Sequence, residues 1–195
     1  MSENQSTSEK LLLAAIALMA EKGYDSTTTK EIAAAAGVNE VTLFRHFGTK
    51  QRLLEAAFQR YHYADEMTRL FAEELTYELH ADLLKISHAY HRIMNRNRQL
   101  IHIAIKGGSE LPETIRQEAS RHPGQLKQLL TRYLTEMAEM QKVLPSKQHE
   151  QQALSFMWMN YGAFVTGLKN EEWLEGALTG FVEESVRIFA RGLAP

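Results

Sequence analysis

Residues 28–47 read TTKEIAAAAGVNEVTLFRHF, and this stretch decides how the N-terminal third of the 195-residue chain folds. Thr28 and Glu31 have the spacing of a capping box, in which each side chain satisfies a backbone donor left open at a helix start. We therefore predict a short helix that begins at Thr28 and ends before Gly37, which supplies the turn. Asn39 is a favoured N-cap for a second short helix that fills the rest of the stretch.

The predicted helix pair has one packed side and one free side. Ala33 and Ala36 are small enough to allow the helices to cross closely. The apolar side chains expected to lock the second helix against the first are Ile32, Val38, Leu43 and Phe47. Polar side chains then remain on the outward side of the second helix. A helix held in this way fits the major groove of double-stranded DNA, where every base pair displays a distinguishable pattern.

The segments on either side of this pair also read as helices. Apolar residues recur at three- and four-residue spacing through the chain, and no alternating β-branched stretch appears, so we predict an all-α protein. The first helix is expected from Ser8 to Lys22, with Gly23 as its stop. Its apolar face consists of Leu12, Ala15, Ile16 and Met19. A longer helix from Thr49 is expected to lead away from the pair.

The rest of the chain is predicted to be a larger helical domain. Gly107-Gly108 and the run His122-Pro123-Gly124 are expected to break helices. The expected helices lie near residues 81–95, 98–106, 112–121, 124–142, 146–169 and 172–191. The last two combine large apolar residues with interleaved small ones, which allow helix axes to approach closely.

Composition excludes several classes of protein. The chain has no cysteine, so it offers neither disulfides nor a thiolate zinc site, and nothing indicates an oxidising compartment. The longest apolar run, residues 11–20, is too short to cross a bilayer, and the N-terminus does not read as a secretory signal. We expect a cytoplasmic protein. The net charge of −2 means that contact with nucleic acid must be local. The residues that would form such a positive face are Lys30, Arg45, His46, Lys50 and Arg52.

At this level of detail the N-terminal third resembles the DNA-binding domain of the TetR family. The resemblance rests on Glu21-Lys22-Gly23-Tyr24, Thr27-Thr28, Glu31-Ile32-Ala33, Ala36-Gly37-Val38, Thr42-Leu43-Phe44, His46-Phe47 and Lys50. It implies a three-helix DNA-binding domain, which we place at residues 1–52, and a larger helical domain over 53–195 that holds an effector. It also implies a homodimer built largely from the last two helices.

The resemblance further implies which side chains meet DNA. Arg45 is expected to bond a guanine edge, Glu40 to accept from a cytosine amino group, and Val41 to touch a thymine methyl. Lys50 would anchor a phosphate. The full expected set is Thr28, Thr29, Lys30, Asn39, Glu40, Val41, Thr42, Phe44, Arg45, His46 and Lys50. Phe44 departs from the tyrosine common in the family, so it either packs on the sugar-phosphate or turns inward.

The effector pocket is harder to place. Histidine, methionine and aromatic side chains suit an adaptable apolar pocket, although they also fill ordinary cores and dimer interfaces. The candidates are His88, His91, Met94, Tyr133, Met137, Phe156 and Tyr161. His88 and His91 have a spacing that would let two ligands share one metal, but the more common roles for such histidines lead us to predict neither metal nor cofactor.

Three classes of function follow from these observations. The leading hypothesis is a homodimeric repressor that leaves a pseudo-palindromic operator when a small molecule binds. The alternative is a DNA-binding protein whose C-terminal domain binds a protein partner. We predict that the chain is not an enzyme, because it shows no nucleophile–base pair, phosphate loop or metal signature.

Overall fold

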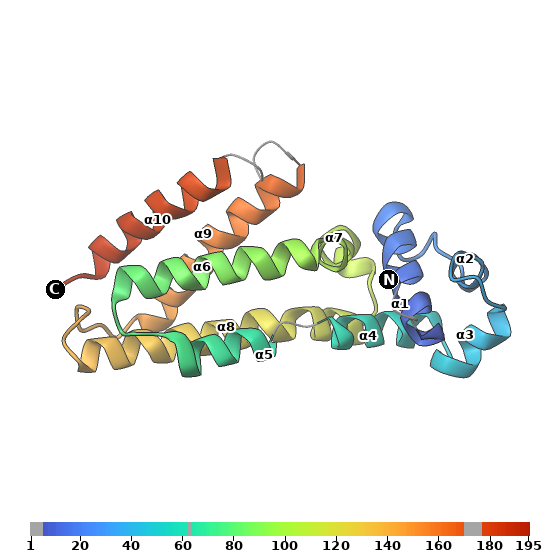
Figure 1. Cartoon of the computed structure of the whole chain (residues 1–195), viewed down its shortest axis with the longest axis horizontal. Helices are drawn as coiled ribbons and strands as arrows, with labels where there is room; N and C mark the ends of the chain where they lie inside the picture. The colour runs from blue at the N-terminus through green and yellow to red at the C-terminus, as the bar shows by residue number, and fades with distance from the viewer. Residues whose placement is uncertain (1–5, 62–63, 170–176) are drawn as a thin grey trace. The chain divides into compact units, whose positions relative to one another are not determined.

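The computed structural model describes residues 6–61, 64–169 and 177–195 (Figure 1). All regular structure in these residues is helical, without a strand, which confirms the predicted all-α class. The elements are α1 (Thr7–Lys22), α2 (Thr29–Ala35), α3 (Glu40–Phe47), α4 (Lys50–Arg60), α5 (Ala64–Arg69), η1 (Leu70–Glu74), α6 (Leu79–Arg96), α7 (Arg98–Gly107), η2 (Gly108–Glu110), α8 (Glu113–Glu139), α9 (His149–Lys169) and α10 (Leu178–Leu193). Within the described residues, no helix is long and apolar enough to cross a membrane.

The described chain divides into two compact units. The first unit combines residues 6–61 with 97–121, and the second combines 64–96 with the described residues beyond 121. This division differs from a boundary at residue 52, because α4 and α7 both pack in the first unit. Their apolar residues join one core with α1, where Leu53, Leu54 and Ile103 are nearly or fully inaccessible to solvent.

In the first unit, α1 lies against α2, α4 and α7. Its buried residues are Leu11, Leu12, Ala15, Ile16 and Met19, which include the whole predicted apolar face. Ser6 caps the helix by accepting a hydrogen bond from the backbone amide of Glu9 at 3.2 Å. Gly23 ends it with a positive φ of 90°. This helix is therefore the support on which α2 and α4 are assembled.

In the second unit, α6 packs against α5, α9 and α10. One buried network fixes its start. The carboxylate of Asp82 accepts hydrogen bonds from the Tyr133 hydroxyl at 2.8 Å and from the Thr76 backbone amide at 3.0 Å. The ring of Tyr77 stacks on that of Tyr133 with 5.9 Å between centroids. The turn before α6 is thereby attached to α8.

Two segments differ from the helices expected from sequence. The predicted break at His122-Pro123-Gly124 is wrong, because α8 runs without interruption through Pro123. The ring of Pro123 lies at the surface, and the next turns bury Leu126 and Leu130, so packing outweighs the hydrogen bond that proline cannot make. The second difference is that residues 64–74, for which no helix was predicted, form α5 and the π-helical η1 and bury Met67 and Leu70.

The last predicted helix corresponds to α10. We expected it over residues 172–191, and α10 covers Leu178–Leu193. Residues 172–176 of that prediction lie outside the described residues. The helix expected over 146–169 begins at His149 in α9.

The continuity of α8 gives a test at Gly124. A Cβ added there meets nothing within 4 Å, and its backbone is helical, so Gly124→Ala should raise the free energy of unfolding by about 0.5–1 kcal/mol in urea denaturation. Gly37→Ala is the contrasting control, since a side chain at its φ of 69° should lower stability by about 1–2 kcal/mol. Destabilisation by Gly124→Ala would mean that the helix is interrupted at this point.

Candidate nucleic-acid interface

The start of α2 is held by the predicted capping box. The Thr28 hydroxyl accepts from the Glu31 backbone amide at 3.2 Å, and the Glu31 carboxylate accepts from the Thr28 backbone amide at 2.9 Å. Lys22, at the end of α1, also donates to the Glu31 carboxylate at 2.9 Å. The hydrogen bond from Lys22, and to a smaller extent those from Thr28, lower the pKa of Glu31 from 4.5 to about 2. One carboxylate thus joins the end of α1 to the start of α2.

The turn between α2 and α3 depends on Gly37. The backbone amide of Val38 donates to the Ala33 carbonyl, and that of Gly37 to the Ala34 carbonyl, both at 3.0 Å. This is the hydrogen-bond pattern of a Schellman turn, whose left-handed residue is Gly37. The chain therefore leaves α2 in a fixed direction.

The start of α3 is also fixed from two sides. Asn39 caps it by accepting from the Val41 backbone amide at 3.1 Å. The Thr29 hydroxyl donates to the Glu40 carboxylate at 2.6 Å, which links the first turns of α2 and α3. Thr29 and Glu40, which are both expected to contact DNA, are therefore bonded to each other in the free protein.

The inner and outer faces of α3 differ sharply. Leu43 is completely buried, and Phe47 and Val38 are packed against the same core. On the outer face, Val41 is 72% exposed and Phe44 is 47% exposed. Lys30, Arg45 and His46 are exposed as well, whereas Thr42 is half-buried. Phe44 thus faces outward, which is the first of the two orientations considered for it.

Lys50 has a structural role that the sequence did not indicate. Its ammonium donates to the backbone carbonyls of Tyr24 at 2.8 Å and Thr27 at 3.0 Å, and it lies 4.3 Å from the centroid of the Tyr24 ring. The buried Thr27 hydroxyl donates to the Gly23 carbonyl at 2.7 Å. Lys50 therefore fixes the loop that leads into α2, and a phosphate contact by the same residue stays a prediction.

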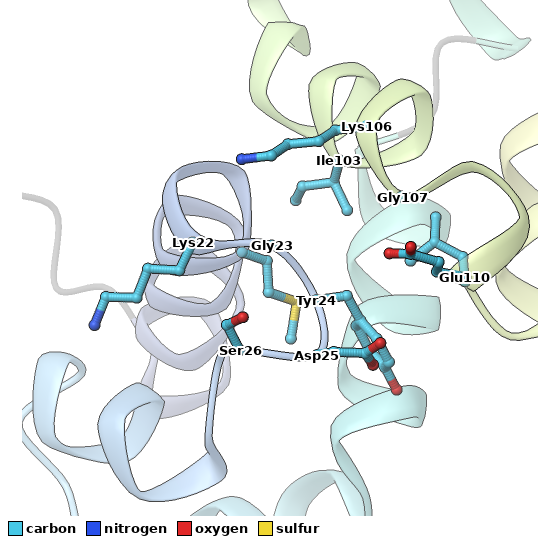
Figure 2. A pocket seen from close by; sticks show the side chains of 11 residues that line it. Lys22, Gly23, Tyr24, Asp25, Ser26, Ile103, Lys106, Gly107 and Glu110 are labelled. Carbon is cyan, nitrogen blue, oxygen red and sulfur yellow. The ribbon is translucent and has the colours of Figure 1, made fainter.

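A cavity of about 170 Å³ lies behind this loop, within the first unit. Its walls are the end of α1, residues 23–26, the last turns of α7 and η2, as Figure 2 shows. Lys106 extends from α7 toward the end of α1, where it donates to the Glu21 carbonyl at 3.3 Å. None of the predicted effector residues lines this cavity.

The predicted effector residues all belong to the second unit but differ in environment. His91, Met94, Tyr133, Met137 and Phe156 are buried. His88 is exposed, and Tyr161 is half-buried with its ring edge-on to Trp158 at 5.4 Å. The Tyr133 hydroxyl is already bonded to Asp82, and the Phe156 ring packs on Phe189. The two histidines therefore do not share one environment, and the described residues contain no cluster suited to a metal ion.

With this geometry established, comparison with known proteins identifies relatives. Residues 11–57 match the model of the bacterial regulatory proteins of the tetR family. The chain is 31% identical over 189 residues to the HTH-type transcriptional regulator YvkB of Bacillus subtilis, covering 96% of this chain and 97% of that protein. It is 42% identical over 64 residues to an HTH-type transcriptional repressor of Mycobacterium tuberculosis, covering 33% of each protein.

Solved structures share the fold over nearly the whole chain. The fatty acid degradation regulator FadR from Bacillus halodurans matches with a TM-score of 0.73 at 16% identity, over 97% of both chains. NalD, the secondary repressor of the MexAB-OprM multidrug efflux pump in Pseudomonas aeruginosa, matches with a TM-score of 0.70 at 19% identity, over 96% of this chain and 95% of that one. The predicted helix-turn-helix and the larger helical domain are confirmed.

The bond between Lys22 and Glu31 gives a pH test. Because the pKa of Glu31 is lower in the folded chain than its ordinary value, its stabilising effect is full above about pH 4.5 and is lost as the pH falls toward 2. Glu31→Gln should therefore show a shallower fall in unfolding free energy over that range than the native chain. Glu139→Gln, at the exposed end of α8, should keep the native slope. Identical pH profiles for the native chain and Glu31→Gln would contradict the assignment.

Proposed function

Because the chain belongs to the tetR family of bacterial regulatory proteins, we propose that it is a cytoplasmic repressor that binds a pseudo-palindromic operator as a homodimer and leaves it when a small molecule binds its second unit. The observation that carries this proposal is the outer face of α3. This helix is anchored on one side and presents exposed Val41, Phe44 and Arg45 on the other. Membership of this family also confirms that the chain is a regulator and not an enzyme.

The proposed base contacts follow from side-chain chemistry. Arg45 has the forked donor group that bonds the O6 and N7 acceptors of guanine, and Val41 offers an apolar surface for a thymine methyl. Phe44, exposed one turn after Val41, extends that apolar surface. Lys30, Arg52 and His46 are exposed and suit phosphates. Glu40 is assigned to a cytosine amino group, with Thr29 as its partner before DNA binds.

The proposed dimer uses α9 and α10, which pack together in the second unit. Trp158 of α9 is 65% exposed and Ile188 of α10 is 59% exposed. Large exposed apolar side chains are costly on a monomer and are typical of interfaces. A two-fold dimer would present two α3 helices to major grooves about 34–36 Å apart, or a multiple of that distance.

The proposed release mechanism requires that the second unit, when a small molecule is bound to it, prefer a conformation different from the one that binds DNA. A ligand shifts such an equilibrium only by its difference in affinity between the two states. Adaptable methionine and aromatic side chains, such as Met94, Met137 and Phe156, support a site in this unit. If the protein binds its operator with the same affinity whether or not a small molecule occupies the second unit, ligand release is ruled out. The proposal of DNA binding would then still stand.

Arg45→Ala tests the DNA-reading face. Duplexes selected by the native protein from a random library provide the operator, and the variant should lose about 1–3 kcal/mol of binding free energy, or roughly 5- to 150-fold in affinity. The loss should relax specificity at one base pair of each half-site. Arg69→Ala, which removes the same charge from an exposed position on α5, should bind like the native chain. Equal losses in the two variants would contradict base recognition by α3.

Ile188→Asp tests the proposed dimer. A carboxylate in an apolar interface is left without a partner, so the variant should sediment as a monomer at micromolar concentration and lose operator affinity. Ile105→Asp is the matched control, because that isoleucine is 42% exposed on α7, outside the last two helices. A dimeric Ile188→Asp protein with native affinity would place the interface elsewhere.

A further inference from the structure

Three polar side chains lie in the interior of the second unit where α6 meets α9. Ser87 is 0% exposed, His91 is 6% exposed and Asn160 is 2% exposed. Ser87 and His91 are four residues apart, so they share one face of α6. Asn160 comes from α9, which packs against α6 and brings its amide beside the His91 ring. We call these three residues the polar cluster.

The polar cluster is left with unused hydrogen-bonding capacity. Among the described residues, the Ser87 hydroxyl has no hydrogen-bond partner, and the His91 ring nitrogens and the Asn160 side-chain oxygen lie beside each other without a well-aligned hydrogen bond. The Asn160 amide nitrogen is used, since it donates to the Phe156 carbonyl at 2.9 Å. Buried polar groups in folded proteins are nearly always paired, so several open positions in one place require an explanation.

The polar cluster is uncharged at neutral pH. Burial lowers the pKa of His91 from 6.5 to about 4, although the Asn160 amide favours the protonated ring and the nearby His88 opposes it. A neutral imidazole offers one donor and one acceptor. The buried carboxylate of Asp82 is already bonded to Tyr133 and Thr76. The cluster itself therefore contains no charged group that would pair with a buried charge.

The neighbours of the polar cluster are apolar or aromatic. The Tyr90 ring meets the His91 ring edge-on with 5.4 Å between centroids. Met94 follows His91 by one helical turn and is buried, and Phe156 precedes Asn160 by one turn of α9 and is buried as well. The immediate surroundings of the cluster are therefore apolar and partly aromatic.

We propose that the effector of this regulator is an uncharged molecule whose amide-like group, with both donor and acceptor atoms, bonds Ser87, His91 and Asn160 while its apolar body packs among the aromatic neighbours. This inference rests on the proposed function, because it names the chemical class of the ligand that would release the repressor from its operator. The competing occupant is ordered water, which also satisfies buried polar groups. An anionic or cationic effector is disfavoured, because a charge taken from water would find no partner there.

Benzamide, benzoate and benzamidine provide the test, since the three have nearly the same shape and differ in charge at pH 7. Binding to the native dimer is measured by ligand-observed NMR and by thermal shift, without DNA. Benzamide should bind at least tenfold more tightly than either charged analogue. Equal affinity for all three, or tighter binding of a charged one, would overturn the proposal.

Two variants locate the site. His91→Leu should abolish benzamide binding, because it removes a donor and an acceptor, and Met67→Leu, at a buried position on α5, should retain it as the control. Asn160→Asp keeps the shape and adds a carboxylate beside the His91 ring, so it should shift the preference toward benzamidine over benzoate by at least tenfold. Asn160→Asp also provides a second test of the site if the His91→Leu protein does not fold. An unchanged preference in Asn160→Asp would place the ligand elsewhere.

The remaining outcomes separate this inference from the proposed function. If no probe binds up to its solubility limit while His91→Leu raises thermal stability, the polar cluster holds water and the inference fails. If benzamide binds at the cluster but leaves affinity for the selected duplex unchanged, the assigned chemistry stands and ligand release fails. If benzamide lowers that affinity in the native protein but not in His91→Leu, both are supported.

Discussion

An eight-residue helix cannot keep its shape alone in water, and this constraint governs the first unit. Closing a first helical turn is unfavourable, and isolated helices shorter than about 12–15 residues are marginal. α3 therefore takes its order from outside itself, through the Asn39 cap, the hydrogen bond from Thr29 to Glu40, and Leu43 in the core. Because these contacts supply the stability, Val41 and Arg45 carry no structural duty and are free for recognition.

The helix-turn-helix and the second unit treat polar groups in opposite ways. Around α2 and α3, the Lys50 ammonium and the Thr27 hydroxyl are bonded to backbone carbonyls, which holds the loop in one geometry. Between α6 and α9, Ser87 and His91 keep donors and acceptors unused. The proposed DNA-reading surface gains from fixed geometry, whereas the proposed ligand would satisfy the donors and acceptors that the second unit leaves open.

Features set by neighbouring residues were predictable from the sequence, and features set by distant contacts were not. The capping box at Thr28 and the turn at Gly37 depend on residues within one helical turn, and both were found as predicted. The bonds of Lys50 reach carbonyls more than twenty residues away, for which no local pattern exists. Pro123 satisfies every local rule for ending a helix, yet the buried residues that follow it keep α8 continuous. The unpaired state of the polar cluster likewise depends on how α6 meets α9.

The discontinuous first unit has a consequence for gene engineering and for synthesis on the ribosome. Its core needs Leu100 and Ile103 of α7, which follow its N-terminal part only after the chain has passed through residues 64–96. A fragment cut after residue 61 would leave the apolar surface of α1 uncovered and prone to aggregate. The first unit therefore cannot be transferred to another protein as one continuous N-terminal segment. During synthesis, the nascent chain cannot complete the core of this unit until α7 has left the ribosomal exit tunnel.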